Sequence, residues 1–304
     1  MNAPGSVRIG INPITWSNDD MPALGGDTPL ETCLAETRQA GYAGIEMGGK
    51  FPKTAEALRP VLAKHGLAFI SGWYSARLLE RDADAEIAAM RPHLDLMAGM
   101  GCTVMVFAEV SGGTHGDRTK PADTRRTITE AEWPEYARRI GAVARHMKSR
   151  GVHLAFHHHM GTAIQTEAEI DRLMVGTGPE VGLLLDTGHA TYAGADPLAL
   201  AKRHAGRIVH VHCKDVRRPV LDQALARRQS FLDAVVDGVF TVPGDGSIAY
   251  KPILSHLAGQ GYRGWLVVEA EQDPAKAHPL TYATMGFRNL RALAQDSGFT
   301  VATG

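Results

Sequence analysis

Side chains that can bind a metal ion recur in the second half of the chain, each time at the end of an apolar run. A mixture of imidazole and carboxylate donors suits Mn²⁺, Co²⁺, Fe²⁺ or Zn²⁺, and it is too rich in nitrogen for Mg²⁺ or Ca²⁺. The pattern therefore predicts a transition-metal site. The groups are His157 to His159 in HLAFHHHMGT, Asp186 with His189 in LLLDTGH, His210, His212 and Lys214 in HVHCKD, and Glu269 with Glu271 in VVEAE.

The alternation of side chains along a β-strand divides these groups into two faces. It places His157 and His159 on one face and His158 on the other. By the same rule the HVHCKD residues His210, His212 and Lys214 share a face, as do the two glutamates of VVEAE. If each strand end supplies one inward ligand, the site has two imidazoles and two carboxylates. Whether the first ligand is His157 or His159 stays open at this point.

The elements that must position these residues are short β-rich runs that alternate with amphipathic stretches. Such alternation predicts a parallel sheet, and eight units fit a closed (β/α)8 TIM barrel of the α/β class, with its active site at the C-terminal ends of the strands. An open doubly wound sheet would need a glycine-rich loop after the first strand, and INPITWSNDDM is not one. The expected strands cover residues 8–16, 44–49, 68–75, 103–112, 153–161, 182–190, 208–215 and 266–272.

Other polar and aromatic residues near the expected strand ends are candidates for proton transfer and for the pocket walls. Histidine titrates in a range that suits proton transfer from carbon, and aromatic faces pack against sugar-like rings. The proton-transfer candidates are Glu46, Glu109, His159, His189 and Lys214. The pocket candidates are Asn12, Trp16, Lys50, Trp73 and Tyr74, together with His159 as a substrate contact.

The whole chain, residues 1–304, is expected to form one barrel domain with a helical excursion at about 216–250. That excursion is predicted to hold one extra helix, in LDQALARRQSFLDAVVDG, and the turn PGDG. A formal net charge of -1 argues against nucleic acid and anionic membranes as partners. The three cysteines form no CxxC pair, which is typical of a reduced, cytoplasmic protein without disulfides.

Four segments, LLLDTGHATYAGADP, RIVHVHCKDVR, VFTVPGDGSIAYKPIL and GYRGWLVVEAEQDP, resemble the sugar isomerase/epimerase superfamily of xylose isomerase-like barrels. More narrowly, GINPITWSNDDMPALGG, GIEMGGKFP, HHHMGT and TVPGDG resemble the inosose dehydratases of inositol catabolism. The resemblance implies one divalent ion held by the fifth to eighth strands. Asp186, His212 and Glu269 match the usual ligands, and His157 stands where a glutamate is common. Mn²⁺ or Co²⁺ is the expected ion, with Zn²⁺ or Fe²⁺ as alternatives.

The resemblance also implies a reaction, the removal of water from 2-keto-myo-inositol (inosose) to give a trihydroxycyclohexane-dione. The expected enzyme is thus a carbon–oxygen lyase whose metal acidifies the carbon beside the ketone and stabilises an enediolate. A keto-sugar epimerase or isomerase would share the same metal and barrel. A non-catalytic, metal-containing sugar-binding barrel is a further alternative, and a nuclease with several zinc ions would need a basic groove. The expected partner is a small polyhydroxy ketone, and assembly into a homo-oligomer stays open.

Overall fold

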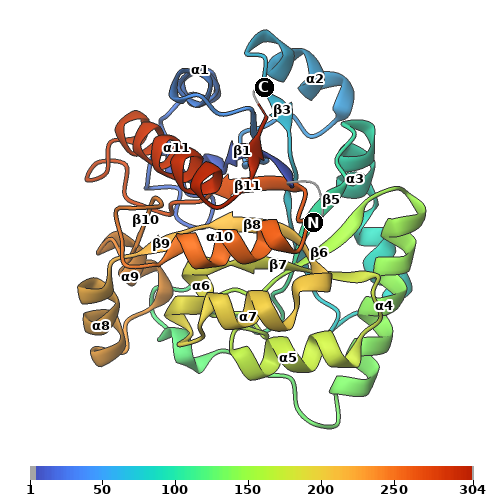
Figure 1. Cartoon of the computed structure of the whole chain (residues 1–304). Coiled ribbons are helices and arrows are strands. Elements are labelled where there is room, and N and C mark those ends of the chain that lie inside the picture. Colours follow the sequence, from blue (N-terminus) through green and yellow to red (C-terminus); the bar gives the residue numbers. More distant parts are fainter. Residues whose placement is uncertain (1–4, 303–304) are drawn as a thin grey trace.

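A parallel β-sheet that curls into a barrel forms the centre of the structure (Figure 1). The structure is a computed structural model and describes residues 5–302. In hydrogen-bonding order its strands are β3 (Ala68–Phe69), β2 (Gly44–Ile45), β1 (Ser6–Ile11), β11 (Gly264–Val268), β8 (Ile208–Cys213), β7 (Val181–Asp186), β6 (His153–His157), β5 (Val104–Glu109) and β4 (Trp73–Ala76). A short last strand, β12 (Thr300–Val301), pairs with β1.

One strand segment closes the ring. The expected strand 68–75 is divided into β3, which pairs with β2, and β4, which pairs with β5. Between them the Ile70 N–H donates to the Ile45 carbonyl at 3.1 Å, and the Val106 N–H donates to the Gly72 carbonyl at 3.2 Å. The segment therefore joins both ends of the sheet, and the predicted (β/α)8 barrel is confirmed.

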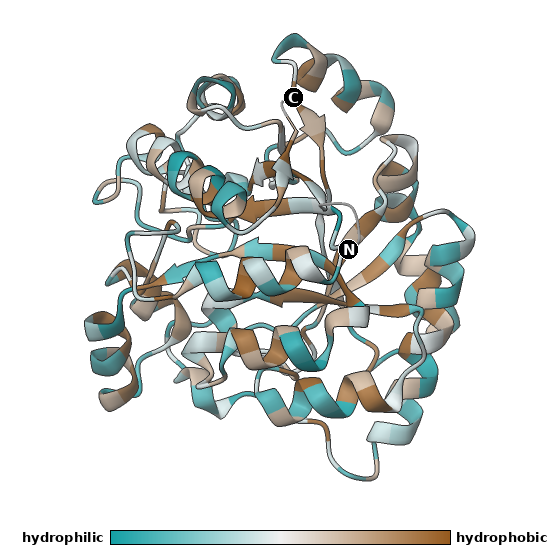
Figure 2. Cartoon of the chain, in the orientation of Figure 1, coloured by the Kyte–Doolittle hydropathy of each residue, from teal (hydrophilic) through white to brown (hydrophobic). Residues whose placement is uncertain are grey.

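Helices surround the barrel, with their apolar sides inward and their hydrophilic sides outward (Figure 2). In α4, for example, the buried residues Tyr136, Ile140, Val143 and Met147 recur every three to four positions, as expected for one face of a helix. The helices after successive barrel strands are α1 (Leu30–Ala40), α2 (Ala55–Lys64), α3 (Ala83–Gly99), α4 (Trp133–Ser149), α5 (Glu167–Gly176), α6 (Thr187–Tyr192) with α7 (Pro197–Arg203), α10 (Tyr250–Gly259) and α11 (Pro279–Asp296). Within residues 5–302 none of the helices is long and apolar enough to cross a membrane.

The register between neighbouring strands brings the predicted ligands together. Strands β5 and β7 are buried along their whole length, which explains their continuous apolar runs VMVFAE and VGLLLD. Asp186 at the end of β7 pairs with His212 in β8, and His157 at the end of β6 pairs with Leu184. Their side chains therefore reach the same end of the barrel.

The excursion between the seventh and eighth barrel strands contains two helices rather than the single predicted one. It consists of β9 (Asp215–Val216), α8 (Arg218–Ala226), α9 (Phe231–Val236) and β10 (Phe240–Thr241), with β9 and β10 antiparallel. The helix is interrupted because Arg228 has a left-handed φ of 48° and the Ser230 side chain caps α9. Phe231 and Phe240 lie in a second apolar cluster with Met160 and Tyr192. That residues 1–304 form one domain stays a prediction.

Candidate metal centre

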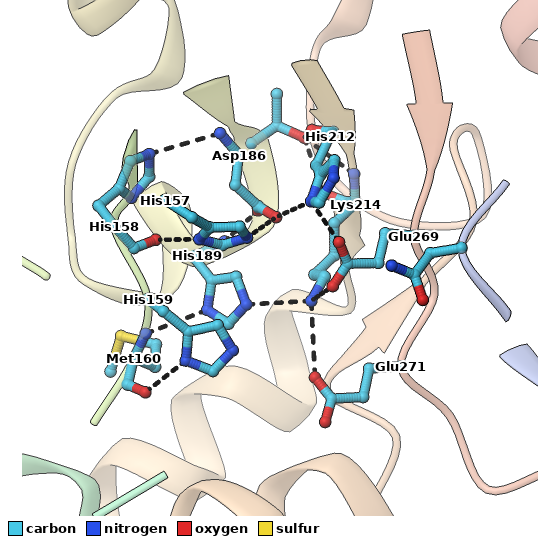
Figure 3. A network of polar contacts seen from close by, with 12 residues as sticks. His157, His158, His159, Met160, Asp186, His189, His212, Lys214, Glu269 and Glu271 are labelled. Atoms are coloured by element: carbon cyan, nitrogen blue, oxygen red, sulfur yellow. Dashed lines mark hydrogen bonds and ion pairs between the residues drawn. The ribbon is translucent and has the colours of Figure 1, made fainter. Parts of the chain in front are cut away.

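Four buried side chains converge at the C-terminal ends of four consecutive barrel strands (Figure 3). They are His157 on β6, Asp186 on β7, His212 on β8 and Glu269 directly after β11. Each offers one potential ligand atom, and these atoms all lie within 4.8 Å of one another. The structure thus brings together the predicted ligand set, including His157 as the residue from the fifth barrel strand.

Three atoms of this group lack hydrogen-bond partners. Asp186 Oδ2, His212 Nδ1 and Glu269 Oε2 are buried and form no hydrogen bond within residues 5–302. Asp186 Oδ2 lies 3.5 Å from both His157 Nε2 and His212 Nδ1, and His212 Nδ1 also contacts Glu269 Oε2. Because an unsatisfied buried polar atom costs about 1–3 kcal/mol, three such atoms that face one point indicate a missing positive charge.

The hydrogen bonds of the two histidines agree with a cation at this point. His157 Nδ1 lies 2.9 Å from the His158 carbonyl and donates to it, so that the Nε2 lone pair faces Asp186. His212 Nε2 donates to Glu46 at 3.2 Å, so Nδ1, which faces Glu269, is the nitrogen that either a proton or a metal ion can occupy. Lone pairs that face carboxylates repel unless a cation lies between them. Two imidazole nitrogens and two carboxylate oxygens therefore fit a divalent transition-metal ion.

The electric field at this point also favours a cation. Burial lowers the pKa of His212, but the carboxylates of Glu269 and Glu46 outweigh it and raise that pKa well above its ordinary value. The same carboxylates attract either a proton on His212 or a metal ion in front of it. Metal binding at this point therefore competes with protonation of His212.

Glu46 orients His212, and this role differs from the predicted proton transfer. Its two oxygens accept hydrogen bonds from His210 Nε2 at 2.8 Å, His212 Nε2 at 3.2 Å and Asn12 Nδ2 at 2.8 Å. Although burial alone would raise the pKa of Glu46, the His212 and His210 imidazoles hold it well below its ordinary range. An ionised carboxylate behind a ligating histidine fixes the ring orientation and its tautomer.

Lys214 and His189, two predicted proton-transfer groups, lie beside the ligands but do not line the cavity. Lys214 Nζ is 2.7 Å from Glu269 Oε1 and 3.0 Å from His189 Nε2. The other ring nitrogen of His189 faces the Met160 N–H at 3.2 Å. Burial, the neighbouring His159 ring and the Lys214 charge lower the pKa of His189 well below its ordinary value. The structure therefore favours a neutral His189.

A cavity of about 360 Å³ opens in front of the metal ligands. Besides the candidate ligands His212 and Glu269, four other predicted residues line it: Asn12, Glu46, Trp73 and His159. The Trp73 ring packs edge-on against His157 and His159, with centroids 5.4 and 5.3 Å apart. The cavity is lined by Asn12, Pro13, Ile14, Ser17, Asp19, Asp20, Glu46, Met47, Gly48, Gly49, Lys53, Trp73, His93, Val106, His159, His212, Glu269 and Glu271.

Five polar residues of the cavity lining were missed as site residues: Ser17, Asp19, Asp20, Lys53 and His93. Glu271, which the sequence places on the same strand face as Glu269, also lines the cavity. Its carboxylate accepts a hydrogen bond from Asn18 at 3.0 Å, and burial raises its pKa to about 7. Lys53 and His93 have no comparable signal, since they come from a loop and from the middle of α3.

Trp16 and Lys50 do not line the cavity, contrary to the prediction. A short 3₁₀ helix, Pro13–Thr15, follows β1, and Trp16 then points into the main apolar core, where its indole N–H donates to Glu36 at 2.6 Å. Lys50 is exposed and donates to the Thr28 carbonyl at 2.5 Å. The directions of these loops, rather than the residue types, exclude both side chains from the cavity.

Glu109 and Tyr74 also lie outside the cavity lining. Glu109 is buried and accepts backbone hydrogen bonds from Leu78 at 2.7 Å and Ser111 at 3.0 Å, so it joins two loops outside the cavity lining. The Tyr74 hydroxyl donates to Glu86 at 2.5 Å. His158 points away from the four ligands, as the alternation predicted, and its Nε2 faces the Asp186 N–H at 3.4 Å.

Comparison with known proteins identifies the family. Residues 34–296 match the family model described as a xylose isomerase-like TIM barrel. The chain belongs to this family. It is 55% identical over 302 residues to the rhizopine catabolism protein MocC of Rhizobium meliloti, and the alignment covers 99% of this chain and 93% of that protein. It is 43% identical over 290 residues to the inosose dehydratase of Geobacillus thermodenitrificans (strain NG80-2), with coverage of 94% and 96%.

Solved structures support the same fold. The IolI protein with a bound zinc atom superposes with a TM-score of 0.67 at 16% sequence identity, with 96% of this chain and 99% of that chain covered. The resemblance predicted from the quoted segments is confirmed, since the chain is similar over nearly its whole length to MocC and to proteins named inosose dehydratase. Its relatives make it an enzyme of the hydro-lyase class, within a superfamily of sugar dehydratases and isomerases.

Proposed function

We propose that this enzyme is a metal-dependent dehydratase that removes water from inosose, a six-membered cyclic polyhydroxy ketone. The observation that carries the proposal is the convergence of four buried side chains, His157, Asp186, His212 and Glu269, with three unsatisfied atoms among them. Two of them, His212 and Glu269, line a cavity of about 360 Å³. The sequence similarity to proteins named inosose dehydratase supports the choice of substrate.

The donor set, two imidazole nitrogens and two carboxylate oxygens, favours Mn²⁺ or Co²⁺, with Zn²⁺ or Fe²⁺ as alternatives. When bound, such an ion supplies Lewis acidity toward the ketone oxygen of the substrate and an adjacent hydroxyl. The protein contributes the orientation of the ligands. Glu46 holds His212, and the His158 carbonyl holds His157.

The cavity residues determine how the substrate is held and where protons can move. The Trp73 ring offers an apolar face to the carbon skeleton of the substrate ring. His159 and Glu271 are the buried groups in the cavity wall, next to the metal ligands, that can hold or transfer a proton. Dehydration requires proton removal beside the ketone and protonation of the leaving hydroxyl, which two separate groups can provide.

The metal ligands do not distinguish dehydration from epimerisation, because both reactions begin with the same proton removal. The test is therefore an assay of the purified protein with inosose and, separately, with ketoses, combined with elemental analysis of bound metal. Dehydration produces a conjugated enol-dione with new ultraviolet absorbance, and epimerisation does not. Binding of inosose without turnover would instead favour the sugar-binding alternative.

Variants of the ligands extend the test. We expect Asp186→Ala and His212→Ala to lose most of the bound metal and the dehydration activity. Asp171→Ala is the control, because Asp171 pairs with Arg203 and His204 outside the cavity and should leave both properties unchanged. Retention of metal and activity in both ligand variants would refute the proposed centre. The cytoplasmic location, the absence of nucleic-acid and membrane partners, and the oligomeric state stay predictions.

A further inference from the structure

The Lys214 ammonium group is a completely buried positive charge beside the candidate metal centre (Figure 3). Its Nζ lies 2.7 Å from Glu269 Oε1, 3.0 Å from His189 Nε2 and 3.5 Å from Glu271 Oε2. The ring of Phe240 closes one side, with its centroid 4.5 Å from Nζ. A buried charge persists only when its surroundings compensate it, and here two carboxylates do so.

The groups that surround this ammonium are metal-ligand types. His159, His189 and Glu271 are buried, and their potential ligand atoms all lie within 4.8 Å of one another. Two of the three contact Lys214 Nζ directly. Without the lysine side chain, two imidazoles and a carboxylate would face one another next to the first ligand set, which is a donor set suitable for a second divalent ion.

Glu269 connects the two positions. Its Oε2 faces His212 in the four-residue ligand set, and its Oε1 accepts from Lys214 Nζ at 2.7 Å. A carboxylate that directs one oxygen to each of two cations is the arrangement expected when two metal ions share a site. Here the second cation is part of the chain.

The space around the lysine is closely filled. A Cβ atom added to Gly188 would lie 2.5 Å from Lys214 Cγ, so the lysine side chain packs directly against the start of α6. Removal of the side chain beyond Cβ would therefore open a small volume enclosed by the same polar atoms.

We propose that Lys214 is a built-in cation that occupies a second metal position and thereby keeps the centre mononuclear. This inference rests on the proposed metal centre. Its consequence is a fixed positive charge next to Glu269 that does not depend on the metal concentration.

Metal stoichiometry tests the proposal. The wild-type protein and Lys214→Ala are saturated with Mn²⁺ or with Co²⁺, freed of excess ion by gel filtration and analysed for metal content. We expect one ion per chain in the wild type and two in Lys214→Ala, with electron paramagnetic resonance of the Mn²⁺ form showing spin coupling only in the variant. Circular dichroism verifies that the variant is folded.

The double variant Lys214→Ala/Glu271→Ala is the matched control, since it lacks one ligand of the second position and should return to one ion. One ion per chain in folded Lys214→Ala would overturn the inference. Two ions per chain in the wild type would also overturn it, and this second test does not depend on whether the variant folds. Absence of metal from the wild type would instead refute the proposed function on which the inference rests.

Discussion

Hydrogen bonds at single residues determine which nitrogen of each ligating histidine is free for a metal. His157 donates from Nδ1 to a backbone carbonyl, whereas His212 donates from Nε2 to Glu46, so the two rings present different nitrogens to the same point. Sequence alternation places both side chains inside the barrel but does not assign these nitrogens. They are assigned by the hydrogen-bond acceptor behind each ring, the His158 carbonyl for His157 and Glu46 for His212.

The orienting role of Glu46 can be measured at this scale. In Glu46→Gln one carboxylate oxygen becomes an NH₂ group, which faces at least one N–H donor that the lost oxygen accepted from: Asn12 on one side, or His210 and His212 on the other. Because the orientation of His212 is then less well fixed, we expect the affinity for Mn²⁺ or Co²⁺ to fall by roughly 10–100-fold in calorimetric titration. Glu86→Gln, a buried glutamate that contacts Tyr74, is the control with unchanged affinity. Wild-type affinity in Glu46→Gln would contradict the role.

At the scale of elements, Glu109 joins the end of β5 to the segment that follows β4. Glu109 pairs in register with Ala76, and its side chain reaches the backbone of Leu78. Arg139 of α4 donates to the Leu78 carbonyl at 2.7 Å and holds the same segment from outside. A polar residue at a strand end is thus used here for the connection between elements, which composition and spacing alone do not reveal.

This connection should depend on pH. Burial is the largest influence on Glu109 and raises its pKa to about 7, while hydrogen bonds from Ser111 and Leu78 oppose the rise. The folded state then binds more protons than the unfolded state between the ordinary pKa of glutamate and about 7, so this contribution to stability falls as pH rises through that interval. At about 1.4 kcal/mol per pKa unit, the loss over the whole interval is roughly 3–4 kcal/mol.

We therefore expect Glu109→Gln to remove this part of the pH dependence. Thermal unfolding of the metal-free wild type and variant at pH 5 and pH 8 measures it. The wild type should lose more stability than the variant between the two pH values. Parallel changes in both proteins would show that Glu109 does not titrate in this interval.

At the scale of the whole molecule, the candidate metal centre spans half of the barrel. Its four ligands come from β6, β7, β8 and the residue after β11, four neighbouring strands of one sheet. The excursion places Phe231 and Phe240 against the ring of His189, at centroid distances of 5.6 and 5.2 Å, and so closes one side of this region. We therefore expect metal binding and barrel stability to be coupled.

Addition of Mn²⁺ or Co²⁺ should raise the unfolding temperature of the metal-free protein, and chelation should reverse the shift. At a metal concentration 100-fold above Kd, linkage predicts about 2.7 kcal/mol of added stability. In His212→Ala the shift should be lost, because one of the four ligands is missing. Differential scanning calorimetry measures both proteins, and an equal shift in the variant would place the stabilising ion elsewhere.

The sequence by itself determined the barrel and the end of it at which the candidate ligands gather. The alternation of strands and helices, the period of two along each strand and the polar strand ends are local properties, and they are sufficient to place His157, Asp186, His212 and Glu269 at one end of a closed sheet. Parallel strands have their C-terminal ends at the same edge, so spacing along the chain becomes proximity in space.

Only the tertiary structure decided what surrounds those ligands. Trp16 and Lys50 lie in loops whose directions depend on packing, and Glu46 and Glu109 acquire their partners from elements far away in the chain. Lys214 is the clearest case, because three strand ends and the excursion must assemble before its ammonium is enclosed by two carboxylates, an imidazole and a phenyl ring. Burial and long-range contacts, which no local pattern encodes, set these roles.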